Sequence, residues 1–311
     1  MTRQATSQHA VLVALFALGA VSLGACSSLR TSASGAATDT LPIAPTVADT
    51  FAPTVSDLPA TLAPTTASAP RTPPTTEETT TSVSETTTTL AANIVVVGAF
   101  PVPIVAVGKA SGPDTAVAQL RLLQLGFWNS SADGEYGLTT KQAVMAFQKY
   151  IGLEATGSLD DNTAAFLTGT AVRAHGQADA GTLVEVDKAR QLLFVVVDGR
   201  TEWVFNTSTG NGLPYEAEDQ NSPGSPLIKG VALTPDGLWT VNRERPDGWW
   251  DGDLGSIYRP KYFRGGIAVH GSNSIPNYPA SHGCVRVSVP AMDFIWETDL
   301  MPLKITVWVH G

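Results

Sequence analysis

The chain has 311 residues, an apolar fraction of 43% and a formal net charge of −9. This length allows two ordinary domains, and the negative charge argues against a nucleic-acid partner, because phosphates require an excess of Lys and Arg. The two cysteines, Cys26 and Cys284, lie in separate local contexts that explain each of them, so we do not expect a disulfide between them.

Residues 1–25 have the pattern of an export signal. Arg3 precedes an apolar run from Val11 to Leu23, which is too short to cross a bilayer core of ~30 Å as a helix. The run ends in LGAC, which resembles a bacterial lipoprotein box. That resemblance implies that Cys26 is diacylated and anchors the chain to the outer face of the cytoplasmic membrane. A plain signal peptide whose cleavage site lies near a cysteine is the alternative.

We expect residues 26–108 to form a tether with a β-prone end. The part up to residue 92 is rich in Thr and Pro and has a single aromatic residue, so it cannot bury enough apolar surface to offset its ordering entropy. The β-branched runs Ile94–Val97 and Pro103–Val107 predict extended structure. They could pair as a hairpin or add an edge to the next domain.

The segment 109–170 has the pattern of a small three-helix domain. Pro113 suits the first position of a helix and Gly126 suits its end. A second helix is expected from Thr139 to Gly152, and a third from Ser158 to Leu167. The domain contains neither His nor Cys, so we expect a binding module rather than an enzyme.

The spacing of apolar residues predicts which helix faces are buried. We expect two such faces: Val117, Leu120 and Leu123 in the first helix, and Val144, Phe147 and Ile151 in the second. Thr139 and Gln142 have the spacing of a capping box that would open the second helix.

Several short motifs in this segment resemble the peptidoglycan-binding type 1 domain. They are QLRLLQLGF at 119–127, DGEYG at 133–137, AV followed by FQ within 143–148, GL at 152–153 and TG at 156–157. The resemblance implies binding to cell-wall glycopeptide. A module that only positions its neighbour is the alternative.

The segment 182–311 predicts a mainly-β domain with one clear helix. Alternating or β-branched runs predict strands at 183–186, 192–197, 202–207, 238–241, 266–270 and 305–309. Asp198 and Gly199 predict a tight hairpin turn, and Ser288 can cap a helix that runs to about Thr298. The long stretch 211–236, rich in Gly, Pro, Asn and Asp, predicts an irregular loop that is functional or mobile.

Residues 265–286 carry the chemistry of a thiol nucleophile. Cys284 needs a base or a cation nearby to react at neutral pH, because a free thiol is mostly protonated there. His270 ends an apolar strand and His282 lies two residues before the thiol. Gly283 permits a close backbone approach, and the N–H groups near Gly283 and Cys284 could receive an oxyanion.

A zinc site is the competing interpretation of the same residues. His270, His282 and Cys284 are all possible zinc ligands. A catalytic zinc site also needs a general base, and no carboxylate occurs between residues 254 and 292. We therefore expect neither a metal nor another cofactor. A zinc amidase or carboxypeptidase and a non-catalytic wall-binding lipoprotein remain as alternatives.

The pattern His270-Gly271 followed by SHGCVR at 281–286 resembles the catalytic domain of the L,D-transpeptidases (YkuD type). Further matching pieces are VEVD at 184–187, STG at 208–210, TPDG at 234–237 and YRPKYF at 258–263 before Gly265-Gly266. The fold that the two resemblances imply is a small three-helix peptidoglycan-binding domain followed by a mainly-β catalytic domain.

The resemblance implies a role for each matching residue. Cys284 would be the nucleophile, His270 its proton acceptor and donor, and His282 and Gly283 would shape the turn. The residues expected to contact substrate are Tyr258, Gly271, Ser281 and Arg286. Arg286 stands where some family members have Asn, and Gly271 stands where others have Ser.

The implied reaction is peptidoglycan cross-linking. The thiolate would attack the diaminopimelate carbonyl of a tetrapeptide stem, D-alanine would leave, and the diaminopimelate amine of a second stem would resolve the thioester into a 3→3 cross-link. Water or a protein amine are alternative acceptors. Six cations near the motif could bind stem carboxylates or be ordinary surface charges, namely Arg243, Arg245, Arg259, Lys261, Arg264 and Arg286. Trp249-Trp250 could line the groove or pack in a core.

Overall fold

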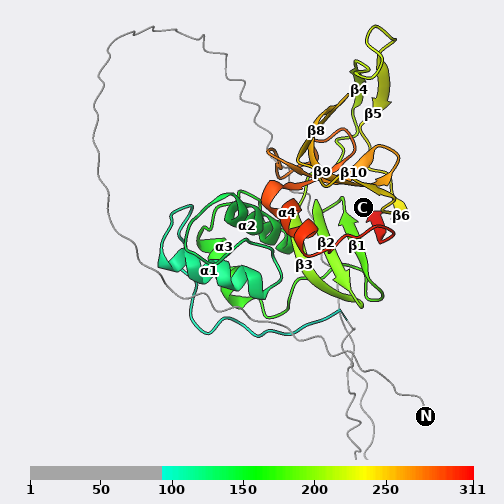
Figure 1. The fold of residues 1–311 in the computed structure, drawn as a ribbon. Helices are drawn as coiled ribbons and strands as arrows, with labels where there is room; N and C mark the ends of the chain where they lie inside the picture. Colours follow the sequence, from blue (N-terminus) through cyan, green and yellow to red (C-terminus); the bar gives the residue numbers. More distant parts are fainter. Residues whose placement is uncertain (1–92) are drawn as a thin grey trace, which may run out of the picture. The chain divides into compact units, whose positions relative to one another are not determined.

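The computed structural model describes residues 93–311 (Figure 1). The predicted export signal, the lipidation of Cys26 and the tether up to residue 92 lie outside this range. Across residues 93–311, every helix is too short or too polar to span a bilayer.

Three helices follow one another in the first part of the described chain: α1 (Pro113–Gln124), α2 (Leu138–Ile151) and α3 (Asp161–Gly169). As predicted, α1 begins at Pro113, and both Gly126 and Gly152 adopt positive φ where a helix ends, at 92° and 77°. Helix α3 starts later than expected, because the side chain of Asp160 caps it by accepting from the N–H of Thr163.

The predicted capping box at the start of α2 is wrong. The N-cap is Gly137, and no side chain caps the helix. The Thr139 hydroxyl lies 2.8 Å from that of Ser130, while Gln142 turns away to contacts in the β domain. Tertiary hydrogen bonds therefore replace the local pair that the spacing suggested.

The predicted apolar face of α1 is also wrong. Val117 and Leu120 are 39% and 46% exposed, whereas Leu122 and Leu125 are fully buried. Arg121 shares the buried side, which the sequence spacing could not show. Its guanidinium donates to the carbonyls of Gly98, Leu167 and Thr170, so the cation is satisfied without water.

Residues 93–108 run as an extended segment against the helices rather than as a hairpin. Val96 forms an isolated antiparallel bridge with Val172, and Gly108 forms another with Leu159. Ile104 is buried in the helical core. The segment thus adds backbone contacts to the helical domain, but it forms neither the hairpin nor a strand at the edge of a sheet.

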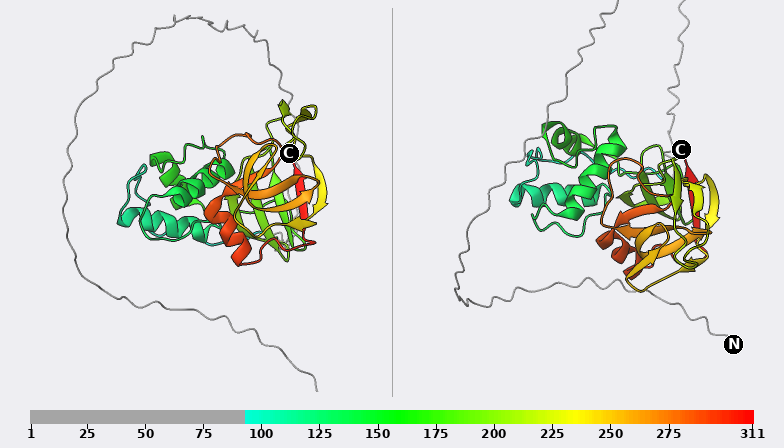
Figure 2. Two further views of the ribbon diagram at one scale, coloured as in Figure 1. Left: turned by 45° about the horizontal axis from the view of Figure 1, so that its top comes forward. Right: turned by 90° about the horizontal axis from the view of Figure 1, so that it is seen from above.

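Two five-stranded sheets form the β domain (Figures 1 and 2). The first has the order β3-β2-β1-β12-β6, with β1 (Leu183–Asp187), β2 (Leu192–Val197), β3 (Arg200–Asn206), β6 (Gly237–Thr240) and β12 (Thr306–His310). The second has the order β11-β10-β9-β7, with β8 also paired to β9: β7 (Arg243–Glu244), β8 (Trp249–Gly252), β9 (Gly255–Arg264), β10 (Ile267–Ser272) and β11 (Val285–Ser288). Helix α4 (Val289–Glu297), capped by Ser288 as predicted, packs on the second sheet.

Strand β2 of the first sheet is covered on both faces, which explains why it reads as an unbroken apolar run. Leu193 and Val195 point into the core between the two sheets. Leu192, Phe194 and Val196 point to the other side, into the core shared with the helices. Alternate side chains of a strand face opposite ways, so only a strand covered on both sides needs every position apolar.

The connection after α1 joins the helices to the edge of this sheet. Phe127 pairs in parallel with Val204 of β3, and the N–H of Trp128 and the N–H of Val204 donate across the junction at 3.0 and 2.8 Å. The helical domain is therefore held to the β domain by main-chain hydrogen bonds as well as by packing.

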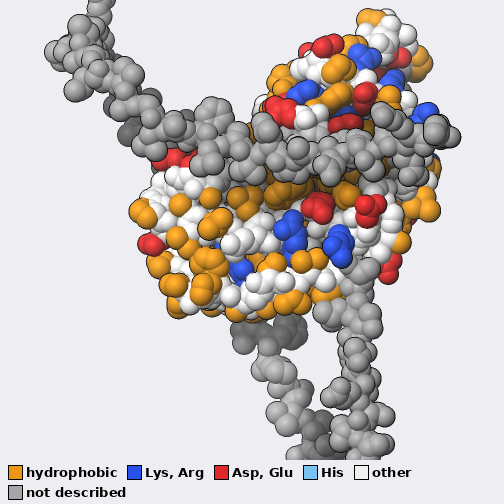
Figure 3. Space-filling view, turned by 60° about the horizontal axis from the view of Figure 1, so that its bottom comes forward, with side chains coloured by type: hydrophobic (Ala, Val, Ile, Leu, Met, Phe, Trp, Pro, Cys, Tyr) orange, Lys and Arg blue, Asp and Glu red, His pale blue; other side chains and the backbone are white. Residues whose placement is uncertain are grey.

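The stretch 211–236, predicted to be irregular, contains a short hairpin of β4 (Pro214–Ala217) and β5 (Ile228–Val231). No residue of either strand is buried, so the strands lack the apolar alternation that marks a strand in sequence. In Figure 1 the hairpin stands away from the two sheets. Hydrophobic side chains are scattered among polar ones over the face seen in Figure 3, as is normal for protein surfaces.

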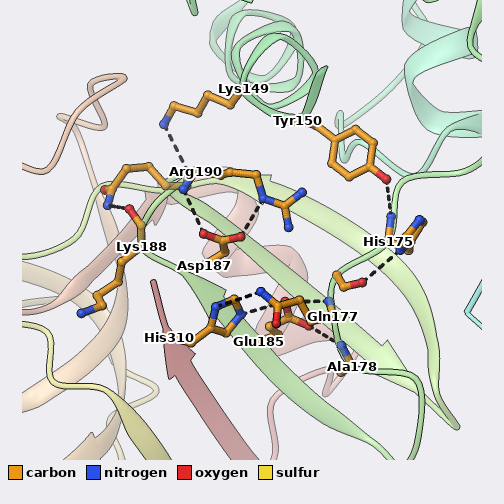
Figure 4. A network of polar contacts seen from close by, with 12 residues as sticks. Lys149, Tyr150, His175, Gln177, Ala178, Glu185, Asp187, Lys188, Arg190 and His310 are labelled. Carbon is orange, nitrogen blue, oxygen red and sulfur yellow. Dashed lines mark hydrogen bonds and ion pairs between the residues drawn. The ribbon is translucent and has the colours of Figure 1, made fainter. Parts of the chain in front are cut away.

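A polar network fixes the joint between the two domains (Figure 4). Glu185 on β1 is fully buried and accepts from the N–H groups of Gln177 and Ala178 and from His310 Nε2, each at 2.9 Å. Nearby, Lys149 Nζ at the end of α2 donates to the carbonyl of Gln191 and to that of Thr207, both at 3.2 Å.

Lys149 makes the stability of the fold depend on pH. Burial lowers its pKa from 10.5 to about 7, so between these values the unfolded chain binds a proton that the folded chain has released. The free energy of unfolding should therefore rise with pH across this window, by up to about 1.4 kcal/mol per pH unit for one proton. Urea titrations at a series of pH values should show a flatter slope for Lys149→Met. The exposed Lys141→Met on the same helix is the control, and an unchanged slope for Lys149→Met would contradict the assignment.

Candidate active site

His270, Cys284 and Arg286 come together because β10 and β11 are parallel neighbours. Their register pairs Val269 with Val285 and His270 with Arg286. Cys284 lies two residues before Arg286, so the three side chains emerge on the same face of the sheet. A bulge in the pairing with β9 lies at His270, and bulges commonly re-aim a side chain.

These residues line a cavity of about 620 Å³. His282 and Ser281 also line it, together with Arg243 of β7 and Trp250 of β8 in the same sheet. The hairpin β4–β5 contributes Tyr215, whose ring lies edge-on to His282 at 5.4 Å. The sequence motifs thus predicted several residues that line the cavity, whereas the hairpin that adds Tyr215 lies in the stretch predicted to be irregular.

The His270 ring is held in one orientation. It is 3% exposed, and Nδ1 lies 2.8 Å from the carbonyl oxygen of Gly271. A carbonyl can only accept, so we assign the ring proton to Nδ1, which leaves Nε2 as the free base. Burial is the main cause that lowers the pKa of His270 to about 4; the bond to Gly271 raises it, and the charge of Arg286 lowers it. The imidazole is therefore neutral at physiological pH.

Cys284 is a free, partly buried thiol. Its Sγ lies 3.8 Å from the carbonyl oxygen of Gly266. Burial raises the pKa of the thiol, while the Ala268 backbone and the Arg286 charge act in the opposite direction. A neutral thiol thus shares the cavity with a neutral imidazole, rather than a preformed thiolate–imidazolium pair.

The turn before Cys284 is held by its own hydrogen bonds. The buried Ser281 hydroxyl donates to the carbonyl of Cys284 at 2.6 Å and accepts from the N–H of Gly283 at 3.0 Å. Gly283 has φ 131°, and a Cβ there would lie 2.8 Å from the carbonyl oxygen of Leu233. Both the conformation and the close contact require glycine. Thr234, missed as a functional residue, donates to the carbonyl of Gly283 at 2.7 Å.

Two of the residues expected to contact substrate lie elsewhere. Tyr258 does not line the cavity; its hydroxyl donates to Asp293 at 2.9 Å. A Cβ on Gly271 would lie 2.9 Å from the Tyr258 ring, so Gly271 makes room for this ring. Because the carbonyl of Gly271 is what holds His270, glycine in place of serine leaves that bond intact.

Four of the six nearby cations separate into two groups. Arg259 pairs with Asp293 at 2.7 Å and the buried Lys261 pairs with Glu244 at 2.8 Å. Arg243 and Arg286 instead line the cavity, and neither forms an ion pair within residues 93–311. Arg243 stacks on the ring of Tyr262 at 3.9 Å, a contact that nothing in the sequence indicated. In the part of the chain that the structure covers, no three His, Cys, Asp or Glu side chains gather as a metal site.

The comparisons with known proteins agree with this architecture. Residues 181–307 match the family model of the L,D-transpeptidase catalytic domain, and residues 111–167 match that of the peptidoglycan binding domain. The crystal structure of an L,D-transpeptidase from Xylanimonas cellulosilytica is 43% identical and covers 68% of this chain and 99% of its own, with a TM-score of 0.60.

Two further similarities are more distant or more local. An L,D-transpeptidase structure from Stackebrandtia nassauensis is 23% identical over 68% of this chain and 98% of its own, with a TM-score of 0.37. The N-acetylmuramoyl-L-alanine amidase CwlM of Mycobacterium tuberculosis is 46% identical over 46 residues, which are 15% of this chain and only 11% of that protein. The chain belongs to the L,D-transpeptidase family and carries a peptidoglycan-binding domain on the N-terminal side of its catalytic domain.

Proposed function

We propose that this chain forms 3→3 cross-links between peptidoglycan stem peptides through a thioester on Cys284. The observation that carries the proposal is the placement of His270, Cys284 and Arg286 on one face of the β10–β11 pair, inside a cavity of about 620 Å³. Family membership makes the chain a wall-processing enzyme of the cell envelope.

The first half of the reaction transfers an acyl group to sulfur. Nε2 of His270 takes the thiol proton while Sγ of Cys284 attacks the diaminopimelate carbonyl carbon of a tetrapeptide stem. Because the N–H of Gly283 is already bound to Ser281, we assign the N–H of Cys284 as the donor to the oxyanion. The carbon–nitrogen bond to D-alanine then breaks, and His270 returns the proton to the leaving amine.

The second half resolves the thioester. The side-chain amine of a second stem attacks the acyl carbon, and the carbon–sulfur bond breaks. The amine proton passes through His270 to the sulfur, which restores the neutral thiol. Water would give carboxypeptidase behaviour and a protein amine would attach a protein to the wall, so the acceptor decides the product.

Arg286 has two roles in this proposal. Its charge favours the thiolate of Cys284, and its guanidinium faces the cavity without an acidic partner in the described chain. Arg243 faces the same space. Both suit the carboxylates that stem peptides carry, because a guanidinium binds a carboxylate through two parallel hydrogen bonds.

The lipid anchor on Cys26 remains a proposal based on the sequence alone. In it, an exported chain would be diacylated at Cys26 and held at the outer face of the cytoplasmic membrane, with residues 26–92 spanning the distance to the wall. Metabolic labelling with a fatty-acid probe would detect the anchor.

Replacing the thiol tests the chemistry directly. With a purified muropeptide donor, Cys284→Ala should form no covalent adduct by mass spectrometry, because no atom remains to carry the acyl group. His270→Ala should slow adduct formation by at least about a hundredfold, the usual contribution of a general base. His175→Ala, outside the cavity, is the control. Cross-linking by Cys284→Ala, or loss of activity with chelators but not with thiol alkylators, would instead favour a metal-dependent enzyme.

The rate of alkylation of Cys284 should report its environment. The rate with iodoacetamide follows the thiolate fraction, so the raised pKa should place its inflection above the ordinary thiol range near ~8.5. Arg286→Ala removes the favourable charge and should move the inflection higher, with Arg286→Lys in between. Arg264→Ala, an exposed cation outside the cavity, should leave it unchanged. An inflection below the ordinary range would contradict the neutral resting thiol.

A further inference from the structure

The loop that separates His270 from the turn at Ser281 rests on the peptidoglycan-binding module. Ile275, in the middle of this loop, is buried, and its carbonyl accepts from Nε2 of Gln142 on α2 at 3.3 Å. Asn277 donates from Nδ2 to the carbonyl of Ala155, also in the module, at 3.0 Å. Both contacts join residues more than a hundred positions apart in the chain.

Gln142 uses both ends of its amide at this junction. Its Nε2 reaches Ile275, and its Oε1 accepts from Nδ2 of Asn206 at 2.5 Å. Asn206 Nδ2 is also 3.5 Å from the Ile275 carbonyl. All three residues are at least nine-tenths buried. Asn206 Oδ1 is the single buried side-chain oxygen or nitrogen in residues 93–311 that lacks a partner, so this amide depends on Gln142 for a good hydrogen bond.

Asn206 immediately precedes residues 207–209, which contact the chain on either side of the turn at 281–284. The hydroxyl of Thr207 donates to the carbonyl of Arg286 at 2.7 Å, and Ser208 exchanges main-chain hydrogen bonds with Arg286. The carbonyl of Thr209 accepts from the N–H of Ser281 at 2.9 Å. The segment 207–209 therefore touches the chain on both sides of Cys284. Lys149 of the module donates to the carbonyl of Thr207 as well.

We propose that Gln142 is a positioning residue for the reaction and that the peptidoglycan-binding module thereby forms part of the catalytic apparatus. Gln142 holds the loop after His270 through Ile275 and the segment behind Cys284 through Asn206. It touches neither reacting group, so it acts through the separation and orientation of the two. The proposal deepens the function proposed above, since it rests on Cys284 as the nucleophile.

The same helix supplies a matched control. Gln148 is as buried as Gln142, but its amide bonds stay inside the module, with Thr156, Gly157, Ser158 and Thr163. Gln148→Ala therefore weakens the module without touching the loop or Asn206. Comparing Gln142→Ala with Gln148→Ala separates positioning from support of the module's own fold.

The experiment combines acylation by a muropeptide donor, followed in a single turnover, with alkylation of Cys284 across pH. It uses the full chain, and circular dichroism checks that each variant is folded. Gln142→Ala should slow acylation on the order of tenfold or more with little change in KM, because small displacements of reacting groups are costly. Its alkylation inflection should move to lower pH, since a loosened turn admits water to the thiol. Gln148→Ala, assayed where its helices remain folded, should keep the acylation rate within about twofold of the parent chain. Its alkylation inflection should stay at the pH of the parent chain. Asn277→Ala, an exposed change in the loop, should shift both in the same direction as Gln142→Ala but less.

Three results would overturn the inference. One is parent-like acylation and alkylation in Gln142→Ala. Another is an equal loss in folded Gln148→Ala, which would assign the effect to module stability. The third applies if Gln142→Ala does not fold: it is an acylation rate and an alkylation inflection in Asn277→Ala that equal those of the parent chain. Absence of an acyl-enzyme in the parent chain, with a shifted alkylation profile in Gln142→Ala, would reject the proposed function and keep the positioning role.

Discussion

The parallel pairing of β10 with β11 is the constraint on which the site depends. It brings His270 beside Arg286 and so places Cys284 on the same face of the sheet. A shift by one residue would turn the thiol to the opposite face, since alternate residues of a strand point in opposite directions. Gly283 secures the approach to β11, because its φ of 131° and its contact with the Leu233 carbonyl exclude a side chain.

Burial is the main cause of the pKa shifts of Cys284 and His270. It raises the pKa of Cys284 and lowers that of His270, so both groups rest in their neutral forms. In the proposed reaction, charge would develop as the sulfur attacks, in an environment where Arg286 and the N–H of Cys284 are already oriented. Such preorganised groups stabilise charge without the cost of rearranging solvent.

The second organising feature is a central strand, β2, that is covered on both sides. Strand β2 contributes Leu193 and Val195 to the core between the sheets and Phe194 to the core shared with the helices. The module is consequently a layer of the same folded body, joined further by main-chain pairing at Phe127 and Val204. A wall-binding unit built this way can transmit its contacts to the loop between His270 and Ser281, as the hydrogen bonds of Gln142 and Asn277 illustrate.

Local patterns in the sequence determined the elements whose stabilising contacts are local or repetitive: the start of α1 at Pro113, the ends at Gly126 and Gly152, the strand 192–197 and the cap at Ser288. They also predicted a thiol nucleophile and its base, because His270-Gly271 and SHGC at 281–284 are short local motifs. Only the tertiary structure decided the buried face of α1, where distant carbonyls satisfy Arg121. The tertiary structure also decided that the Tyr258 ring packs against Gly271. It decided as well that Gln142, expected in a capping box, instead binds the carbonyl of Ile275 in the loop after His270. Several buried faces and side-chain partners are locally possible for each of these residues. Hydrogen bonds and packing between distant residues determine which one forms, and the spacing of residues along the sequence does not encode those contacts.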